Sequence, residues 1–123
     1  MLVRNASDAA NLLRPLVAGS QTETLALAYL DGTGRVLKIT KRQGGADLVE
    51  LSLRDVVAEG LELGACALVL AHNHPSGDPK ASQADVAVTR RLAEVCEAVG
   101  IGVYDHLVFG GTRRISMRAA GLL

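Results

Sequence analysis

Two of the three histidines in this 123-residue chain, His72 and His74, stand one residue apart directly after the continuously apolar run 65–70. Such a run is typical of a strand that is covered on both faces of a sheet. In an extended chain, residues i and i+2 project to the same side, so both imidazoles are expected to point together. A turn-rich loop then leads to Ser82 and Asp85, whose spacing predicts a helix N-terminus. The fold must therefore bring a buried strand end and a helix start to one place.

Two segments nearer the N-terminus predict a β-hairpin. Apolar side chains occupy both faces of 25–30, as in a central strand, and a Gly-containing turn follows at 31–34. Residues 35–41 then return as a second strand, with Leu37 and Ile39 expected on its inward side.

Two helices that pack on the sheet are also predicted, each with a serine at its start. Ser52, with Asp55 three residues on, begins the first helix, and Gly64 ends it. The second helix runs from Ser82 to about Val99. Their buried stripes are expected to comprise Leu53, Val56, Val57, Gly60 and Leu61 in the first helix, and Val88, Leu92, Val95, Cys96 and Val99 in the second.

The N-terminal residues 1–21 predict a helical segment that braces the domain. Ser7 with Asp8 is expected to open its helix. Pro15 is expected to end or restart that helix, because proline removes a helix hydrogen bond.

The C-terminal part of the chain completes the sheet. Residues 101–109 predict a strand, and 113–117 predict an edge strand. A buried sheet with a helix after each of two elements predicts one α/β (α+β) domain with a mixed central β-sheet flanked by helices. The active loop is expected at the carboxyl end of the 65–70 strand, where open α/β sheets usually bind ligands.

The composition limits the classes of function. Thirteen basic residues balance thirteen acidic residues, so no basic nucleic-acid footprint is expected beyond one candidate patch at Arg113, Arg114 and Arg118. Two tyrosines and one phenylalanine are too few for a base-stacking surface. Cys66 and Cys96 lie in apolar patterns typical of buried free thiols in a reducing compartment. With no signal peptide and no apolar run of membrane-spanning length, a cytoplasmic protein without membrane contact is expected.

His72, His74 and Asp85 can supply three ligands to a mononuclear zinc ion and leave the fourth position to water, as a catalytic zinc requires. The loop after His74 folds the chain back, and the helix aims Asp85 inward. A purely structural role is the alternative, with Ser82 and Asp85 as a helix cap and the His-Asn-His turn bonded to a loop. Spacing alone leaves the two interpretations equally open.

The spacing His72-x-His74, seven residues, Ser82, two residues, Asp85 resembles the JAMM signature of the JAB/MPN+ metalloproteases. The longer string His-Asn-His-Pro-Ser-Gly-Asp-Pro is similar to the RadC branch of that family. The resemblance covers 22–123 and implies a RadC-like JAB/MPN+ domain of cytidine-deaminase-like architecture. It is also carried by Glu23, Asp31, Arg54, the run 105–108, Ser116 and the pair Gly121-Leu122.

The resemblance implies a zinc-dependent metallohydrolase of the metalloprotease or isopeptidase type, which hydrolyses an amide bond with a zinc-activated water. In this scheme His72, His74 and Asp85 bind Zn²⁺. Glu23 holds the water and acts as general base, and Ser82 donates a hydrogen bond to the tetrahedral oxyanion. Without the resemblance, Glu23 is an ordinary charged residue at a strand start. The expected partner is a peptide or isopeptide of unknown identity, and the sequence does not specify an oligomeric state.

Two other functions are compatible with the resemblance. The first is a RadC-type DNA-repair-associated factor that acts by binding. The neutral charge, and the lack in these 123 residues of the helix-hairpin-helix region that RadC-like proteins commonly carry, argue against direct nucleic-acid binding. The second is a catalytically silent MPN-type interaction module, but such modules typically lack the metal ligands that are present in this chain.

Two further parts of the sequence, one in the loop before Ser82 and one in the strand 101–109, allow separate predictions. Lys80-Ala81 stands where a proline often precedes the serine, which should alter only the loop. Asp105 and His106 interrupt an apolar strand, where unpaired polar groups would be costly. They are interpreted either as a layer around the metal site or, with a slight preference, as a satisfied core pair.

Overall fold

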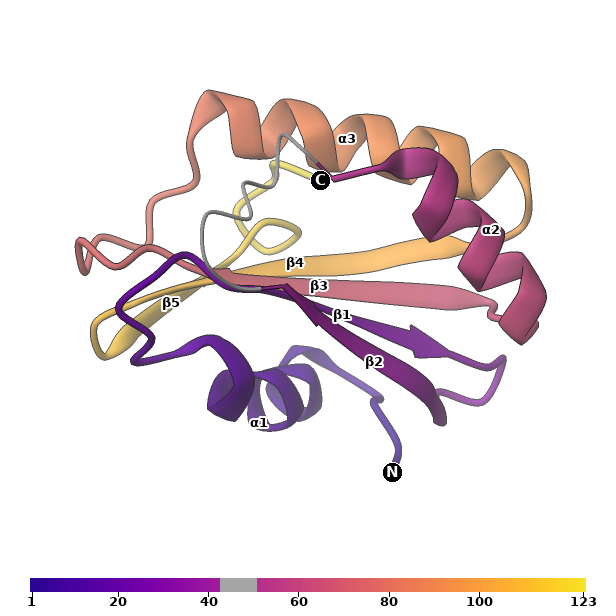
Figure 1. The fold of residues 1–123 in the computed structure, drawn as a ribbon, viewed down its shortest axis with the longest axis horizontal. Helices are drawn as coiled ribbons and strands as arrows, with labels where there is room; N and C mark the ends of the chain where they lie inside the picture. Colours follow the sequence, from indigo (N-terminus) through magenta and orange to yellow (C-terminus); the bar gives the residue numbers. More distant parts are fainter. Residues whose placement is uncertain (43–50) are drawn as a thin grey trace.

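The structure is a computed structural model that describes residues 1–42 and 51–123. Among these residues, five strands form one sheet in the order β2-β1-β3-β4-β5, with α1 on one face and α2 and α3 on the other (Figure 1). The helices are α1 (Ala6–Val17), α2 (Leu53–Leu63) and α3 (Gln83–Ala98), and the strands are β1 (Leu25–Leu30), β2 (Val36–Arg42), β3 (Ala67–Asn73), β4 (Gly102–Gly110) and β5 (Arg113–Ser116).

The sheet is mixed, as the sequence predicts. β1 lies antiparallel between β2 and β3, and β5 lies antiparallel to β4. β3 and β4 are parallel, because α3 carries the chain back across the sheet between them. The mixed α/β fold of a single domain is thereby confirmed.

The two central strands are buried along their whole length. Every residue of β1 and β3 is buried, since helices cover both faces of the sheet. β3 continues beyond its apolar run to include His72 and Asn73. The first histidine is therefore held by strand pairing rather than by a loop.

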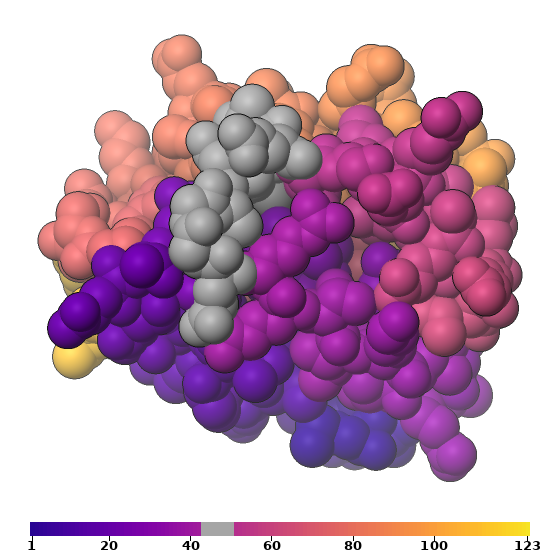
Figure 2. All heavy atoms as spheres, in the orientation of Figure 1, coloured from indigo at the N-terminus to yellow at the C-terminus, as the bar shows by residue number. Residues whose placement is uncertain are grey.

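The hairpin strand β2 is more exposed than its pattern predicts. Leu37 and Ile39, expected to face inward, are 38% and 36% exposed. β2 forms the edge of the sheet, where the helices leave the side chains of both faces uncovered. Figure 2 shows this strand at the surface beside α2, to which it is joined by an ion pair of 3.0 Å between Lys38 Nζ and Glu59 Oε1.

The caps of α2 and α3 are confirmed. Ser52 and Ser82 accept hydrogen bonds from the backbone N–H groups three residues on, and Gly64 ends α2 in the left-handed region at φ 70°. The predicted stripes are wrong at Leu61, which is 55% exposed, and at Val99, which is 42% exposed. Leu61 follows the buried Gly60, and a step of one residue along the helix points its side chain away from the sheet. Val99 lies beyond the last residue of α3.

The N-terminal helix differs from its prediction at both ends. Asn5, not Ser7, caps α1, because its side chain accepts the Asp8 N–H at 2.8 Å. Pro15 lies inside the helix and does not end it. The last turn persists because Leu13 and Val17, on either side of the proline, are fully buried against the sheet.

The two cysteines differ in burial. Cys96 in α3 is buried as expected, and burial raises the pKa of its thiol. Cys66 is exposed, because it precedes β3 in the turn after α2. Within the described parts of the chain, none of the helices combines the length and hydropathy that a bilayer crossing requires.

Candidate metal centre

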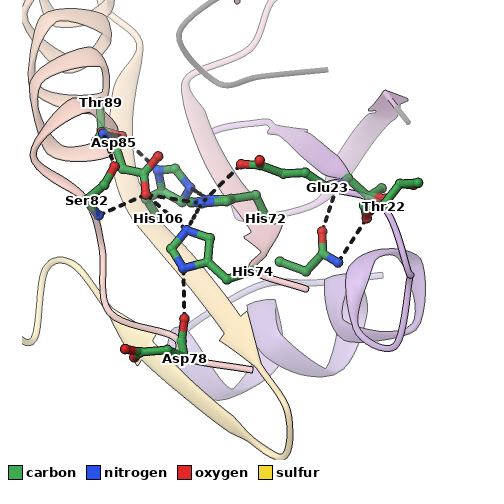
Figure 3. A network of polar contacts seen from close by, with 11 residues as sticks. Thr22, Glu23, His72, His74, Asp78, Ser82, Asp85, Thr89 and His106 are labelled. Carbon is green, nitrogen blue, oxygen red and sulfur yellow. Dashed lines mark hydrogen bonds and ion pairs between the residues drawn. The ribbon is translucent and has the colours of Figure 1, made fainter. Parts of the chain in front are cut away.

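Side chains from three segments meet at the carboxyl end of β3 (Figure 3). His72 lies near the end of this strand, His74 follows its last residue, and Asp85 comes from the first turn of α3. Glu23 precedes β1, whose first residue, Leu25, pairs with His72 across the antiparallel ladder. One potential ligand atom from each of the four residues lies within 4.8 Å of the others. The predicted ligands and the predicted base are therefore brought together.

Three of these atoms form a compact triangle. His74 Nε2 lies 3.0 Å from His72 Nε2 and 3.1 Å from Asp85 Oδ2, and His72 Nε2 lies 3.4 Å from the same oxygen. Ligands bound tetrahedrally to zinc at about 2.0–2.1 Å lie about 3.3 Å from one another. The triangle thus has the size of one face of a tetrahedral zinc site. Glu23 Oε1 lies outside it, 4.0 Å from His72 Nε2.

The ring orientations favour a cation between these atoms. His74 Nδ1 lies 2.9 Å from the carbonyl oxygen of Asp78, which can only accept, so Nδ1 carries a proton, and in the neutral ring Nε2 then keeps its lone pair. His72 Nδ1 lies 2.6 Å from His106 Nε2, which likewise leaves its Nε2 facing Asp85. A neutral imidazole nitrogen and a carboxylate oxygen at 3.1 Å are both acceptors, and a cation between them satisfies both. The residues present therefore fit a zinc ion.

Asp85 has two sets of contacts. Its Oδ2 accepts the Ser82 backbone N–H at 3.0 Å, and Ser82 Oγ accepts the Asp85 N–H at 3.0 Å, which completes a capping box. Burial raises the pKa of the Asp85 carboxyl, but the contact with the His72 ring and the hydrogen bond from the Ser82 backbone N–H outweigh burial and hold that pKa well below its ordinary value. The carboxylate is ionised, and its capping and ligand geometries coexist.

Access to the cluster differs from one side to the other. His72 and Asp85 are buried, whereas Glu23 and His74 are half-buried and reach solvent. Ser82 is exposed and, with His74, lines a cavity of about 410 Å³ beside the cluster. The structure therefore places Ser82 next to the site, although its Oγ is also the helix cap.

Asp105 and His106 are both buried and hydrogen-bonded, as expected of a satisfied core pair, but only His106 also contacts the metal cluster. As neighbours in β4, they point to opposite faces of the sheet. Asp105 accepts hydrogen bonds from the backbone N–H groups of His106 and Arg118 and from the Ser116 hydroxyl. His106 is fully buried behind His72, and this burial, reinforced by His72, lowers its pKa well below the ordinary value.

Two supporting residues were not identified from the sequence. Thr89 Oγ1 lies 2.8 Å from His106 Nδ1, and its position four residues after Asp85 on the same helix face was the available signal. Asn73, between the two histidines, points to the other side of β3. Its Oδ1 accepts the Thr24 N–H at 2.6 Å, and its Nδ2 donates to the carbonyls of Ser20 and Thr22, each at 3.1 Å. Asn73 therefore holds the segment that carries Glu23.

Comparison with known proteins gives one family. A family model described as RadC-like JAB domain matches residues 3–122. A UPF0758 protein of Rhodobacter capsulatus is 44% identical over 108 residues, which are 87% of this chain and 50% of the relative. A UPF0758 protein of Ruegeria pomeroyi is 41% identical over 108 residues, 87% of this chain and 48% of the relative. A UPF0758 protein of Roseiflexus castenholzii is 37% identical over 121 residues, 98% of this chain and 52% of the relative. The chain spans about half the length of these relatives.

Proposed function

Because the chain belongs to the family of RadC-like JAB domains, we propose that it is a zinc-dependent hydrolase that cleaves an amide bond in a peptide or an isopeptide. One observation carries this proposal. Two imidazole nitrogens and an ionised carboxylate face one another at 3.0 to 3.4 Å, at the border of a cavity that solvent can enter. An arrangement of three protein ligands with an open side is the form that catalytic zinc sites take.

In this proposal His72, His74 and Asp85 hold the zinc ion. When bound, zinc supplies Lewis acidity and lowers the pKa of a coordinated water toward about 7. Glu23, placed outside the ligand triangle at 4.0 Å from His72 Nε2, accepts the proton of the attacking water and delivers it to the departing amine. Its half-buried carboxylate keeps the solvent contact that such proton transfer needs.

Ser82 stabilises the opposite side of the reacting amide. Glu23 and Ser82 lie on opposite sides of the two histidines (Figure 3), which supports a base and an oxyanion donor that approach the carbonyl from different directions. The capping bond fixes Ser82 Oγ, because this oxygen accepts the Asp85 N–H and its own hydrogen is left to donate. An oxyanion donor of this kind contributes about 3 kcal/mol to transition-state stabilisation.

The substrate has room beside Ser82. The cavity of about 410 Å³ is bounded by the loop after His74 and the start of α3. This volume suits a short extended segment of polypeptide rather than a folded domain. We propose that one side of the scissile bond occupies this cavity.

The proposal is tested by metal analysis together with hydrolysis assays. Elemental mass spectrometry is expected to find close to one zinc per chain in the wild type and none in His74→Ala. Glu23→Gln should retain zinc and lose turnover of a peptide and isopeptide library by about 10² to 10⁴-fold. The exposed Glu62→Gln in α2 is the matched control and should behave as wild type.

Two results would contradict the proposal. One is a protein that stays zinc-free after reconstitution with excess metal. The other is a Glu23→Gln variant that hydrolyses as fast as the wild type. A zinc-free protein that binds DNA with a steep dependence on salt would instead support the repair-associated binding function.

A further inference from the structure

We propose that Thr89 and His106 form a buried hydrogen-bond relay that fixes the tautomer of His72, so that Nε2 of His72 stays unprotonated toward the metal cluster. This inference rests on the proposed zinc site and extends it inward, away from substrate. Thr89 and His106 are positioning residues, since neither faces the cavity beside Ser82.

The relay is a continuous series of short contacts. Thr89 Oγ1 lies 2.7 Å from the backbone oxygen of Asp85 and 2.8 Å from His106 Nδ1. His106 Nε2 lies 2.6 Å from His72 Nδ1. Thr89 and His106 are fully buried, and His72 is 1% exposed. Each of these polar atoms must therefore find its partner within the relay.

The direction of every bond follows from the first one. A carbonyl oxygen can only accept, so the single hydroxyl hydrogen of Thr89 is donated to Asp85. Thr89 Oγ1 must then accept from His106, which puts the ring proton of His106 on Nδ1. His106 Nε2 is left as an acceptor, and His72 must donate to it from Nδ1. The Nε2 lone pair of His72 is thus directed at the zinc position.

The reversed arrangement is less stable in this geometry. If Thr89 donated to His106, its oxygen and the Asp85 carbonyl would face each other at 2.7 Å with no hydrogen between them. His72 would then carry its proton on Nε2, where it blocks a ligand position. The reversed arrangement therefore loses the hydrogen bond from Thr89 Oγ1 to the Asp85 carbonyl and leaves two oxygens that repel each other.

Thr89 also opposes a competing bond within the cluster. Without metal, an Nε2–H of His72 would gain a charge-assisted hydrogen bond to the Asp85 carboxylate, whose Oδ2 lies 3.4 Å away. The relay holds His72 in the other tautomer despite this attraction. Its effect is therefore to keep the site ready for metal rather than closed by an internal hydrogen bond.

The matched variants Thr89→Val and Thr89→Ser test the relay. Valine has nearly the shape of threonine but no hydroxyl, so His106 loses its Nδ1 acceptor and the attraction of Asp85 decides the tautomer of His72. Long-range ¹H–¹⁵N NMR of the metal-free protein, well above the ordinary imidazole pKa of about 6.5, reports which ring nitrogen is protonated. The expected result is Nδ1–H on His72 and His106 in the wild type and in Thr89→Ser, and Nε2–H on both in Thr89→Val.

Zinc affinity gives a second readout. Loss of such an outer contact typically lowers metal affinity about 10 to 100-fold, so Thr89→Val should weaken zinc binding by that factor while Thr89→Ser binds as wild type. If Thr89→Val does not fold, the pair His106→Leu and His106→Gln replaces it. The leucine variant should bind zinc weakly, whereas the glutamine variant, whose amide oxygen can accept from His72 Nδ1, should bind close to wild type.

The outcomes separate the relay from the proposed function. Nε2–H on His72 in the metal-free wild type, or unchanged tautomers and zinc affinity in Thr89→Val, would overturn the relay. A merely structural role of Thr89 would lower the melting temperature without moving a ring proton. A wild type that binds no zinc would contradict the proposed function, yet its tautomers would still be measurable.

Discussion

At the residue scale, Asn73 joins the two sides of the cluster. It stands between the two proposed histidine ligands, and its amide group holds the backbone at Ser20, Thr22 and Thr24. Glu23 lies within this segment, so the hydrogen bonds of Asn73 to its neighbours keep Glu23 near His72. The position of the proposed base is therefore determined from the opposite side of β3.

Asn73→Ala is expected to preserve zinc binding and to impair catalysis. A displacement of about 1 Å in a catalytic group can cost about 10²-fold in rate, so turnover should fall by up to that factor at unchanged zinc content. The free energy of unfolding should also fall by about 1–3 kcal/mol, because the buried Thr24 N–H loses its partner. Hydrolysis assays, elemental analysis and urea unfolding measure the three quantities. Asn11→Ala, at an exposed position of α1, is the control, and full activity in Asn73→Ala would refute the argument.

Asp85 makes stability depend on pH in the acid range. Its pKa in the folded protein lies below the value of about 3.9 in an unfolded chain. Its stabilisation is therefore complete above that value and is lost as the pH falls toward the folded pKa. Urea unfolding of the metal-free protein at a series of pH values should show this loss, and Asp85→Asn should make the acid-side dependence shallower. The exposed Asp55→Asn should leave it as in the wild type; equal slopes for all three proteins would contradict the prediction.

At the scale of single elements, the loop between β3 and α3 is held by the end of β4. A Cβ atom at Gly110 would lie 2.5 Å from Pro79 N, 2.7 Å from the Asp78 carbonyl carbon and 2.8 Å from Gly77 O. The same stretch supplies the Asp78 carbonyl that orients His74. The close approach of two backbones therefore sets the orientation of one proposed ligand.

Gly110→Ala is expected to displace this loop. Overpacking of this kind costs about 1–3 kcal/mol, and loss of the Asp78 contact should lower zinc affinity about 10-fold or more. Gly32→Ala is a suitable control, because its Cβ would meet only Cys66 Sγ, at an ordinary 3.7 Å. Thermal unfolding and zinc titration measure both effects. Unchanged zinc affinity in Gly110→Ala would show that the loop does not orient His74.

The elements differ in how far the sequence could predict them. The proposed ligands His72, His74 and Asp85 lie within one short segment, so strand alternation and a helix cap were enough to place them together. The position of His106 depends on the register between β3 and β4, in which Leu70 pairs with His106. No local sequence pattern specifies that register. From the sequence, a His106 that contacts His72 could therefore not be distinguished from a His106 that only fills the core beside Asp105.

The burial of side chains was predicted correctly in the middle of the sheet and wrongly at its borders. The continuously apolar strands β1 and β3 are buried as expected. Leu37 and Ile39 alternate in the same way as inward-facing residues, but whether a helix covers them depends on the reach of α1 and α2 across the sheet. Pro15 shows the same limit, since tertiary packing of α1 outweighs the local preference of proline.

At the scale of the whole molecule, α1 covers the face of the sheet opposite α2 and α3 (Figure 1). It packs against β1, β3 and β4, which include the strand that ends in the metal cluster. The prediction of a separate N-terminal segment at 1–21 therefore has a thermodynamic consequence. A helix that completes the core should unfold together with the sheet and not before it.

Leu13→Ala tests this coupling. Leu13 is fully buried in the core cluster beneath the sheet, so its truncation should lower the free energy of unfolding by about 2–5 kcal/mol. Urea unfolding followed by far-UV circular dichroism and by tyrosine fluorescence, to which Tyr29 on the far face contributes, should give one coincident transition in the wild type and the variant. Leu61→Ala, at a position 55% exposed, controls for the loss of a leucine and should change stability by less than about 0.5 kcal/mol. The contrary result would be a loss of part of the circular dichroism of Leu13→Ala at low urea, while tyrosine fluorescence and zinc binding persist. Residues 1–21 would then be a separable brace, and the sheet with its metal cluster would fold without them.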